Sequence, residues 1–471
     1  MAQVAHCLSR AARPRMRVLL CFQCFPPLLK SAGGAAKDSF ALCRALIELG
    51  WQVTLATPVD ISATGEAEVD RWLAAGLVSY VPVAAVRAAS PHGNVAIFDL
   101  FHPASFLAVA RELACGSYDL CIMDDVLFRI VLVLLACACG VPTIATTHTD
   151  VPGLESYKEV SALRLVWAWH LLSMFIATIH ATVSTSFSKL MKARYHVPVH
   201  AVWPPVLWSK EFLRPPEEFV AAGARERNRW LSFLRFTPRA ILLFAGRWSD
   251  EKRIKQLMDA VPEDCALVIV GDGDTRYADE VEAARRRNVL PLRRMLCAEE
   301  LRIAYAACDV LVSASGFETL GNVLVEACAA GVPVAVQPAQ GHLELVEDGC
   351  NSYFVDYDDA KKARCRLGEI VAARLSGQDQ ALQGTLAELG ARLRSMDFSV
   401  SVHESLLAPA LKAADARKKY WRRYVNLVTR FISLLAVVIL WPGIALGSRL
   451  IYMLSSDPRY TFLPAGTAVE P

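Results

Sequence analysis

Short apolar runs alternate with helix-like segments along most of this chain, and the alternation occurs in two separate series. The first series starts with the strand-like run MRVLLCF at 16–22 and continues through the helical segment SFALCRALIELG to the strand-like run QVTLATP. The second starts with RAILLFAGR at 239–247 and continues through CALVIVGDGD and DVLVSAS. Strands that alternate with helices form mostly parallel sheets with helices on both faces. The sequence therefore predicts an α/β protein with two doubly wound domains.

The two series are separated by a stretch rich in proline and charge, which we interpret as a linker with a short helix. A chain of 471 residues is longer than one ordinary domain. Open α/β sheets bind ligands at the carboxyl ends of their strands, so we expect a site in the cleft between the domains. The predicted segments are a basic tail (1–15), a first Rossmann-like domain (16–203), the linker (204–238), a second Rossmann-like domain (239–395), a helix with a basic collar (396–423), a candidate membrane span (424–454) and a tail (455–471).

Composition excludes some classes of protein. Hydrophobic residues make up 54% of the chain and charged residues 21%, which is typical of folded domains and not of a disordered protein. The formal net charge of +3 is nearly balanced, so we expect no nucleic-acid partner. The 14 cysteines occur mostly in apolar segments, where thiols behave as small buried hydrophobes. Cys21 and Cys24 form a C-x-x-C without a second pair at zinc spacing, so a metal or redox role is the weaker alternative.

The C-terminal region contains a candidate membrane span. FISLLAVVILWPGIALGS at 431–448 is uncharged and has about the 18–20 apolar residues that a bilayer-spanning helix needs. A basic segment with tyrosine and tryptophan precedes it, and the positive-inside rule then places the large N-terminal part on the cytosolic or plastid-stromal side. Pro442 and Gly443 leave a re-entrant hairpin open, and a buried terminal helix is the globular alternative. We expect a single-pass membrane protein.

The N-terminus is basic. Arginines stand at 10, 13, 15 and 17, and no acidic residue comes before Asp38. This pattern fits the remainder of a transit peptide. Because the first strand is predicted to start near residue 16, a short basic tail is the interpretation that we favour.

Two glutamates stand among small and apolar residues in GFETLGNVLVEACAAG at 316–331. Glu318 follows a predicted strand, and the next helix is predicted to start between Thr319 and Asn322. The free backbone N–H groups of Thr319, Leu320, Gly321 and Asn322 then suit an anion. Eight residues of helical rise span about 12 Å, so Glu318 and Glu326 could hold the two ends of a nucleotide diphosphate sugar. A solvent-facing Glu326 is the alternative, but its apolar neighbours favour a buried carboxylate that needs partners.

This segment resembles the E-x7-E motif of the family-4 retaining glycosyltransferases of the GT-B fold. ASGFETLGNVLVEACAAGVPV is especially similar to the sulfoquinovosyl-diacylglycerol synthases and to bacterial mannosyl- and glucosyl-lipid transferases. FAGRWSDEKRIKQL resembles the family's G-R-x-x-x-E-K, which implies that Arg247 and Lys252 bind the diphosphate. A guanidinium and an ammonium group are suited to phosphate oxygens. The resemblance covers roughly residues 16–400.

Three further segments resemble motifs of this family. IVGDGD is similar to the G-D-G turn beside the nucleotide, SAGGAAKD to the glycine-rich first loop near the donor phosphate, and TTHTDVPG to T-x-H-T-H-x-P on the acceptor side. The residues that these similarities imply are Gly33, Gly34, Gly271, Asp272 and Gly273 for the donor, and His148 as the active-site histidine.

The chain departs from the family pattern at two places. The linker segment WPPVLWSKEF has no aspartate where relatives show an N-G-V-D-like turn. His148 is followed by Thr149 and Asp150 where many relatives have a second histidine, which leaves the acceptor open. Asp124 and Asp125 end a predicted strand at the cleft, and acceptor contact and helix capping are equally good interpretations. Together with Asp150 they are the candidate acceptor contacts.

The resemblance implies transfer of a sugar from a UDP-sugar to a lipid acceptor of the diacylglycerol type, with retention of configuration. Sulfoquinovose is one of the sugars that the resemblance allows. His148, Glu318, Arg247 and Lys252 are the predicted catalytic residues. GDGD is also a D-x-D, the metal motif of another glycosyltransferase fold, but the paired glutamates fit a metal-independent scheme, so no cofactor is expected. The alternatives are a polyprenol-, dolichol- or protein-directed mannosyltransferase-like enzyme, a sugar-nucleotide epimerase, and a non-catalytic nucleotide-sugar-binding membrane protein.

Overall fold

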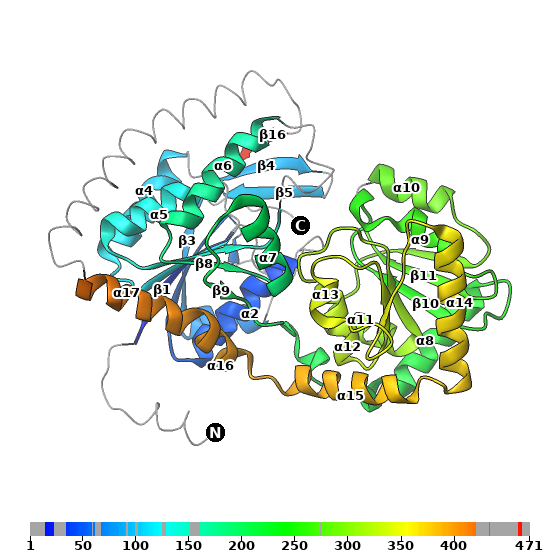
Figure 1. Ribbon diagram of the computed structural model, residues 1–471. Helices are drawn as coiled ribbons and strands as arrows, with labels where there is room; N and C mark the ends of the chain where they lie inside the picture. Colours follow the sequence, from blue (N-terminus) through cyan, green and yellow to red (C-terminus); the bar gives the residue numbers. More distant parts are fainter. Residues whose placement is uncertain are drawn as a thin grey trace.

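The computed structural model shows two α/β bodies that lie side by side (Figure 1). It describes residues 15–22, 34–58, 60–61, 67–90, 93–98, 102–124, 129–150, 161–273, 275–420, 433 and 460–463. Each body contains one parallel sheet with helices on both faces. The predicted pair of doubly wound domains is therefore confirmed.

The N-terminal domain is built on a seven-stranded sheet whose strands pair in parallel. The spatial order is β3 (Val78–Pro82), β2 (Gln52–Thr57), β1 (Arg17–Cys21), β6 (Leu120–Met123), β7 (Thr143–Thr147), β8 (Ile179–Thr182) and β9 (Ala201–Val202). Successive side chains of β1 point to opposite faces, so Leu20 joins one hydrophobic cluster and Leu19 joins another. The helices are α2 (Gly34–Glu48), α3 (Ala67–Ala74), α4 (Pro103–Cys115), α5 (Arg129–Cys139), α6 (Ser161–Ile176) and α7 (Thr185–Tyr195).

The C-terminal domain repeats this plan with a six-stranded parallel sheet. Its order is β12 (Val289–Arg293), β11 (Ala266–Gly271), β10 (Ile241–Ala245), β13 (Val310–Ser313), β14 (Val334–Val336) and β15 (Tyr353–Phe354). Leu243 and Leu242 belong to the clusters on its two faces. The helices are η6 (Asp250–Lys252), α9 (Ile254–Ala260), α10 (Thr275–Ala283), α11 (Ala298–Ala307), α12 (Asn322–Ala329), α13 (His342–Leu345), α14 (Ala360–Ser376) and α15 (Gln380–Ser395).

Each sheet reverses its strand order once, between β1 and β6 in the first domain and between β10 and β13 in the second. Ligands of doubly wound folds bind outside the carboxyl ends of the strands at such a reversal. The segments that follow β6, β10 and β13 carry most of the predicted site residues. The topology therefore places the predicted site where this fold class binds ligands.

The predicted linker is more structured than the sequence suggested. It contains η4 (Lys210–Phe212), η5 (Pro216–Phe219) and the fourteen-residue helix α8 (Val220–Phe233). Trp230 of α8 is almost fully buried in the core of the C-terminal domain. The second half of the predicted linker is therefore part of that domain, because one aromatic side chain on a mostly polar helix is enough to anchor it.

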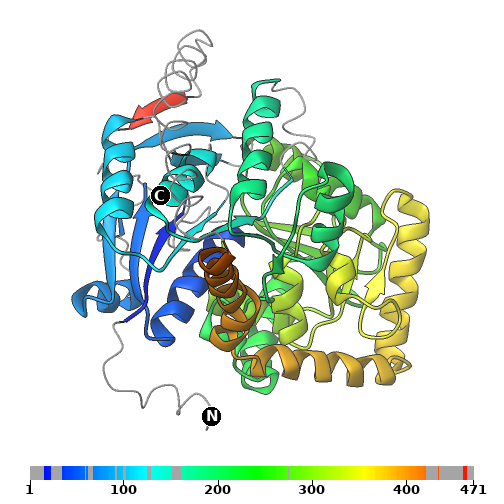
Figure 2. The same cartoon turned by 60° about the vertical axis from the view of Figure 1, so that its left-hand side comes forward.

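The chain returns to the first domain after α15. The π-helical turn η7 (His403–Leu407) separates α16 (Phe398–Val402) from α17 (Ala408–Tyr420), and Val402, Leu406 and Leu407 are buried in a core cluster of the N-terminal domain. Figures 1 and 2 show these orange helices beside the first domain. A small antiparallel sheet of β4 (Ala85–Ser90), β5 (Gly93–Phe98) and β16 (Tyr460–Leu463) was not predicted.

The described helices do not include one that is long and apolar enough to cross a bilayer. The candidate span at 424–454 lies outside the described residues apart from Ser433, and the predicted basic tail lies outside them apart from Arg15. The membrane helix of the sequence analysis stays a prediction.

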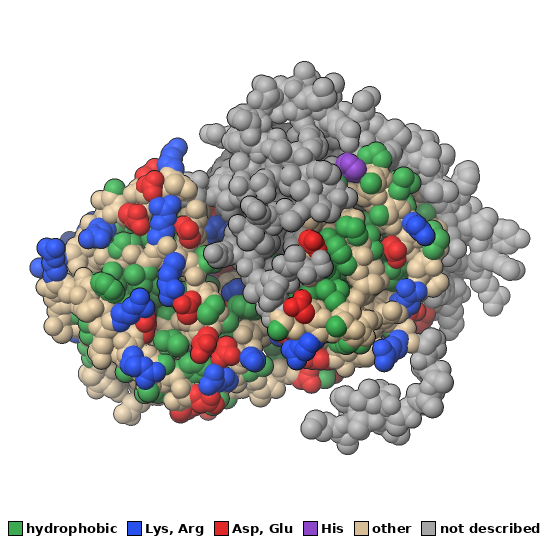
Figure 3. All heavy atoms as spheres, turned by 180° about the vertical axis from the view of Figure 1, so that it is seen from behind, with side chains coloured by type: hydrophobic (Ala, Val, Ile, Leu, Met, Phe, Trp, Pro, Cys, Tyr) green, Lys and Arg blue, Asp and Glu red, His purple; other side chains and the backbone are tan. Residues whose placement is uncertain are grey.

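The described surface shows both signs of charge. In the view from behind, lysine and arginine side chains are interspersed with aspartate and glutamate, and no large area carries only one sign (Figure 3). This distribution agrees with the nearly balanced net charge.

The close contact between α8 and α11 gives a test of the fold. A Cβ at Gly223 would lie 2.6 Å from the carbonyl oxygen of Ala306, whereas a Cβ at Gly384 in α15 would meet nothing within 4 Å. We expect Gly384→Ala to raise the free energy of unfolding by about 0.5–1 kcal/mol, because alanine favours helix. We expect Gly223→Ala to lower it by about 1–2 kcal/mol, because overpacking outweighs the same propensity gain. Chemical unfolding followed by circular dichroism measures both, and equal stabilisation of the two variants would contradict the close helix contact.

Candidate active site

The end of β10 and the segment after β13 bring two predicted donor residues together. The Nζ atom of Lys252, in η6, lies 2.5 Å from Oε2 of Glu318. Both side chains are partly exposed, at 23% and 20%, so a ligand can reach them. Burial acts to raise the pKa of Glu318, but the positive charges of Lys252 and, less strongly, His342 and Arg247 outweigh it and hold that pKa below its ordinary value. Arg247, Lys252 and Glu318 therefore form one charged group.

Helix α12 begins next to this group. Its first residue is Asn322, and Gly321 before it has a left-handed backbone with φ 83° and no side-chain cap. The predicted helix start is confirmed, and the uncapped N–H groups of the first turn suit an anion. Since Glu318 precedes the helix, however, its separation from Glu326 cannot be taken from helical rise, and that part of the sequence argument was wrong.

Glu326 is enclosed. Its side chain has no exposed area, and it lies on α12 between buried neighbours. Oε1 accepts hydrogen bonds from Nζ of Lys37 at 2.7 Å and from Nε1 of Trp208 at 2.9 Å, and Oε2 accepts one from the Tyr305 hydroxyl at 3.0 Å. The prediction of a buried carboxylate with partners is confirmed, and the solvent-facing alternative is wrong. Its predicted contact with a ribose stays a prediction.

On the facing domain, His148 follows β7 and lies between two carboxylates, Asp124 at the end of β6 and Asp38 in α2. Its Nδ1 is 2.5 Å from Oδ1 of Asp124, and its Nε2 is 3.5 Å from Oδ2 of Asp38. Burial raises the pKa of Asp38 to about 6, against the opposing charge of His148 and a hydrogen bond from Asn322. Asp38 was not predicted as a site residue, although it is the last residue of the SAGGAAKD segment.

Asn322 joins the two halves of the site. Its side-chain Nδ2 donates a hydrogen bond of 3.2 Å to Oδ1 of Asp38, which belongs to the other domain. A Cβ at Gly34, the first residue of α2, would lie 3.0 Å from the same Asn322 nitrogen. The first turns of α2 and α12 therefore meet across the domain boundary, and a side chain at Gly34 would crowd that contact.

Arg129 is a further residue that sequence reasoning missed. It is fully buried at the start of α5, where it donates to the carbonyl oxygen of Thr146, to Oγ of Ser173 at 3.0 Å and, at 3.4 Å, to the carbonyl of Asp124. These hydrogen bonds connect the ends of β6 and β7, the strands that Asp124 and His148 follow. One signal was available: a positive charge at the start of an apolar helix opposes the helix dipole and needs a specific reason.

The G-D-G turn packs against the strand end before Arg247. A Cβ at Gly271 would overlap the carbonyl oxygen of Gly246, and a Cβ at Gly273 would overlap that of Trp248, so neither position has room for a side chain. Asp272 accepts hydrogen bonds from the backbone N–H of Gly273 and from Nε of Arg293. The turn thus lies beside the strand end that precedes Arg247, and its contact with a nucleotide stays a prediction.

Asp150 does not join the His148 cluster. Its buried carboxylate accepts hydrogen bonds from Arg194 at 2.9 Å and from the Tyr195 hydroxyl at 2.5 Å, both at the end of α7. Both oxygens are therefore engaged within the N-terminal domain, and an acceptor contact would have to displace these partners. Gly33 and Asp125 lie outside the described residues.

Within the described part of the chain, no group of three or more His, Cys, Asp or Glu side chains is arranged to hold a metal ion. The expectation of a metal-independent enzyme without a cofactor stays a prediction.

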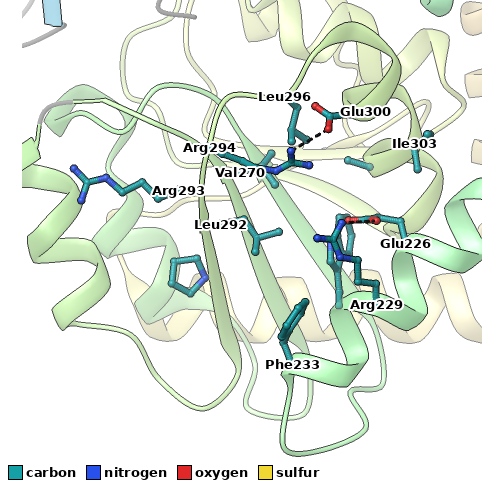
Figure 4. A pocket seen from close by; sticks show the side chains of 13 residues that line it. Glu226, Arg229, Phe233, Val270, Leu292, Arg293, Arg294, Leu296, Glu300 and Ile303 are labelled. Carbon is teal, nitrogen blue, oxygen red and sulfur yellow. Dashed lines mark hydrogen bonds and ion pairs between the residues drawn. The ribbon is translucent and has the colours of Figure 1, made fainter.

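A cavity of about 350 Å³ lies beside the donor half, between α8, β12 and α11. Phe233, Leu292 and Leu296 line it, and the ion pair of Arg294 with Glu300 stands at its edge, while Arg293 points away from the other labelled side chains (Figure 4). The lining includes none of the predicted site residues. Two lining residues contact them: Nε of Arg293 donates to Asp272, and the carbonyl oxygen of Arg294 accepts from the N–H of Gly271 at 3.1 Å.

Comparison with family models matches both halves of the chain. Residues 32–206 match the model described as Glycosyltransferase Family 4, and residues 239–371 match the one described as Glycosyl transferases group 1. Together these ranges cover more than half of the chain. They include the group of Arg247, Lys252 and Glu318 and the cluster of His148, Asp124 and Asp38.

Curated relatives include GDP-mannose-dependent alpha-mannosyltransferases. The protein from Mycobacterium tuberculosis is 31% identical over 44% of this chain and 52% of its own length. The protein from Corynebacterium glutamicum is 30% identical over 47% of this chain and 51% of its own length. The chain thus spans about half the length of these relatives.

Solved structures show the same fold. HepE of Anabaena, in complex with UDP and glucose, has a TM-score of 0.58 at 19% identity and covers 84% of this chain and 100% of its own. WaaG, a glycosyltransferase involved in lipopolysaccharide biosynthesis, has a TM-score of 0.54 at 16% identity and covers 85% of this chain and 99% of its own. Because the two matched models lie in order on the two domains, the chain belongs to the glycosyltransferases that these models describe, and it has the GT-B fold.

Proposed function

We propose that this protein transfers a hexose from a nucleotide diphosphate sugar to an acceptor hydroxyl, with retention of configuration. The observation that carries this proposal is the contact of Asn322 with Asp38. It brings the start of α12, with the cationic group of Lys252 and Arg247, against the His148 cluster of the other domain. One half suits a diphosphate, and the other suits a hydroxyl that loses a proton.

The donor half stabilises the leaving group. When the bond between the sugar C1 and the phosphate oxygen breaks, negative charge develops on the nucleoside diphosphate. Lys252, Arg247 and the first N–H groups of α12 are fixed donors for that charge, and fixed donors need little reorganisation during the reaction. Glu318 holds Lys252 in place and offers a carboxylate oxygen to the sugar hydroxyls.

The acceptor half receives the proton. As the acceptor oxygen forms its bond to C1, its proton passes to the cluster of Asp38, His148 and Asp124. A carboxylate with a pKa of about 6 is mostly ionised at pH 7 and is therefore able to act as a base or to stabilise a protonated imidazole. Asp124 orients the other nitrogen of His148.

We propose GDP-mannose as the donor, because two of the curated relatives above carry that donor in their names. UDP-sugars are the second candidate, including the UDP-sulfoquinovose of the sequence analysis, since HepE was solved with UDP. As the acceptor we propose a lipid hydroxyl, of the diacylglycerol or polyprenol type. The support for a lipid is the uncharged segment 431–448 and the basic stretch before it, which would keep the cleft near a membrane.

A radiolabel transfer assay tests the reaction and the donor together. Membranes that contain the full chain are incubated with labelled GDP-mannose, UDP-glucose or UDP-sulfoquinovose, and the label is followed into lipid, protein and free sugar. Label in lipid from GDP-mannose is the expected result. Label in protein would replace the lipid acceptor, and label that appears only as free sugar would contradict transfer.

Loss of the positive charge of Lys252 should lower the transfer activity. We expect Lys252→Met to lower kcat/KM by about 10²–10³-fold, as loss of one transition-state donor does in other enzymes. Glu318→Gln should lower it as well, because Lys252 loses its charged partner. Lys361→Met on the exposed surface of α14 is the matched control and should retain wild-type activity. Wild-type kinetics in Lys252→Met would remove this residue from the mechanism.

The raised pKa of Asp38 predicts a pH profile. Activity should fall on the acid side with a midpoint near pH 6, as Asp38 takes up a proton, and this limb should disappear in the residual activity of Asp38→Asn. The folded state holds this proton more tightly than the unfolded chain. Its contribution to stability is therefore complete below about pH 4 and is lost as pH rises through about 6. An unchanged acid limb in Asp38→Asn would assign the titration to another group.

A further inference from the structure

Leu320 belongs to the donor loop of the C-terminal domain, but its side chain is buried in the N-terminal domain. It is 5% exposed and is part of a hydrophobic cluster whose other buried members all belong to the N-terminal domain. We call these residues the socket: Trp167, Met174, Val183, Phe187, Met191 and Val197. Burial of a leucine side chain in such a cluster removes apolar surface from water and so stabilises the arrangement in which the two domains meet.

Polar contacts hold the loop at the same place. Oγ of Ser184, the N-cap of α7, donates a hydrogen bond of 2.6 Å to the carbonyl oxygen of Thr319. Nearby, the carboxylate of Glu344 accepts from the backbone N–H of Thr185 at 2.8 Å and of Ser186 at 3.2 Å. The start of α7 is thus bound from the C-terminal domain by two separate segments.

The C-terminal domain supports the loop from behind. The N–H of Gly341 donates a hydrogen bond of 2.6 Å to the carbonyl of Glu318, and a Cβ at Gly341 would lie 2.5 Å from the backbone nitrogen of Leu320. The backbone of Leu320 is therefore in close contact with Gly341, while its side chain extends into the socket. Residues on either side of Leu320 are the predicted ligands of the donor, Glu318 before it and the first turn of α12 after it.

We propose that Leu320 is a positioning residue that shapes the donor site by seating in the N-terminal socket, so that the site is complete only when the domains are closed. This inference rests on the proposed function of the 318–322 loop as the donor loop. If the nucleotide binds only the closed arrangement, its apparent Kd equals the intrinsic Kd divided by the fraction of molecules that are closed without nucleotide.

The test compares Leu320→Ala with Leu320→Met in the full chain. Leu320→Ala empties most of the socket, whereas methionine conserves the volume and should restore the contact. We expect Leu320→Ala to increase the radius of gyration in small-angle X-ray scattering without ligand. We expect it to raise the Kd for GDP, or for UDP if that nucleotide binds the wild type better, by about tenfold or more. In the transfer assay, the KM for the donor should rise while kcat changes much less.

Leu343→Ala is the matched control, because Leu343 is 54% exposed in the neighbouring helix α13 and should change none of these quantities. A purely structural role would lower the melting temperature and the amount of active protein but leave the donor KM of the remainder unchanged, and that result would overturn the inference. So would an unchanged radius of gyration in Leu320→Ala. If the wild type binds neither nucleotide, the proposed function fails, while the scattering comparison still decides whether Leu320 holds the domains closed.

Discussion

The structure depends on an ion pair between its two domains whose carboxylate is buried. Glu326 has no exposed side-chain area, and the cation beside it, Lys37, comes from the other domain. An ionised carboxylate inside a protein is tolerated only when it is paired and hydrogen-bonded, and loss of one partner of such a pair is strongly destabilising. Nε1 of Trp208, in the segment that connects the domains, donates a hydrogen bond to the same carboxylate. Separation of the domains would therefore leave Glu326 without its cation, and water would have to solvate the carboxylate instead. The ion pair thus favours the closed arrangement.

This pair also fixes the register of the helices that meet at the cleft. Asn322 and Glu326 are four residues apart on α12 and so lie on one face of it. They contact Asp38 and Lys37, which are consecutive residues of α2. If α2 rotated or slid, both contacts would change together. The position of Asp38 beside His148 is thus coupled to the position of α12 beside the donor, and the acceptor and donor halves are aligned by one interface.

Much of the fold could be predicted from sequence, because strands buried on both faces read as apolar runs and the intervening helices have their own period. The proximity of Glu318 and Lys252 followed from the resemblance to family motifs. Lys37 and Asp38 could not be found in the same way, since their roles depend on which element lies opposite them in three dimensions. Trp230 shows the same limit for the linker. The polar helix around it was predicted to be part of a linker, but the Trp230 side chain is buried in the core of the C-terminal domain. The strand β16 pairs with β4 across a large separation in sequence, which no local pattern predicts.

The two glutamates of one motif have different environments, and the difference follows from where α12 begins. Glu318 precedes the helix, so its backbone is free to turn toward Lys252 and its side chain stays within reach of a ligand. Glu326 lies one turn inside the helix, on the face that meets α2, and closure of the domains removes it from solvent. A spacing that places one carboxylate on each side of a helix start thus yields one group that can contact a ligand and one that holds the partner domain. Because Lys37, Trp208 and Tyr305 already occupy the oxygens of Glu326 in the closed arrangement, a ribose could contact this carboxylate only after one of these partners had moved.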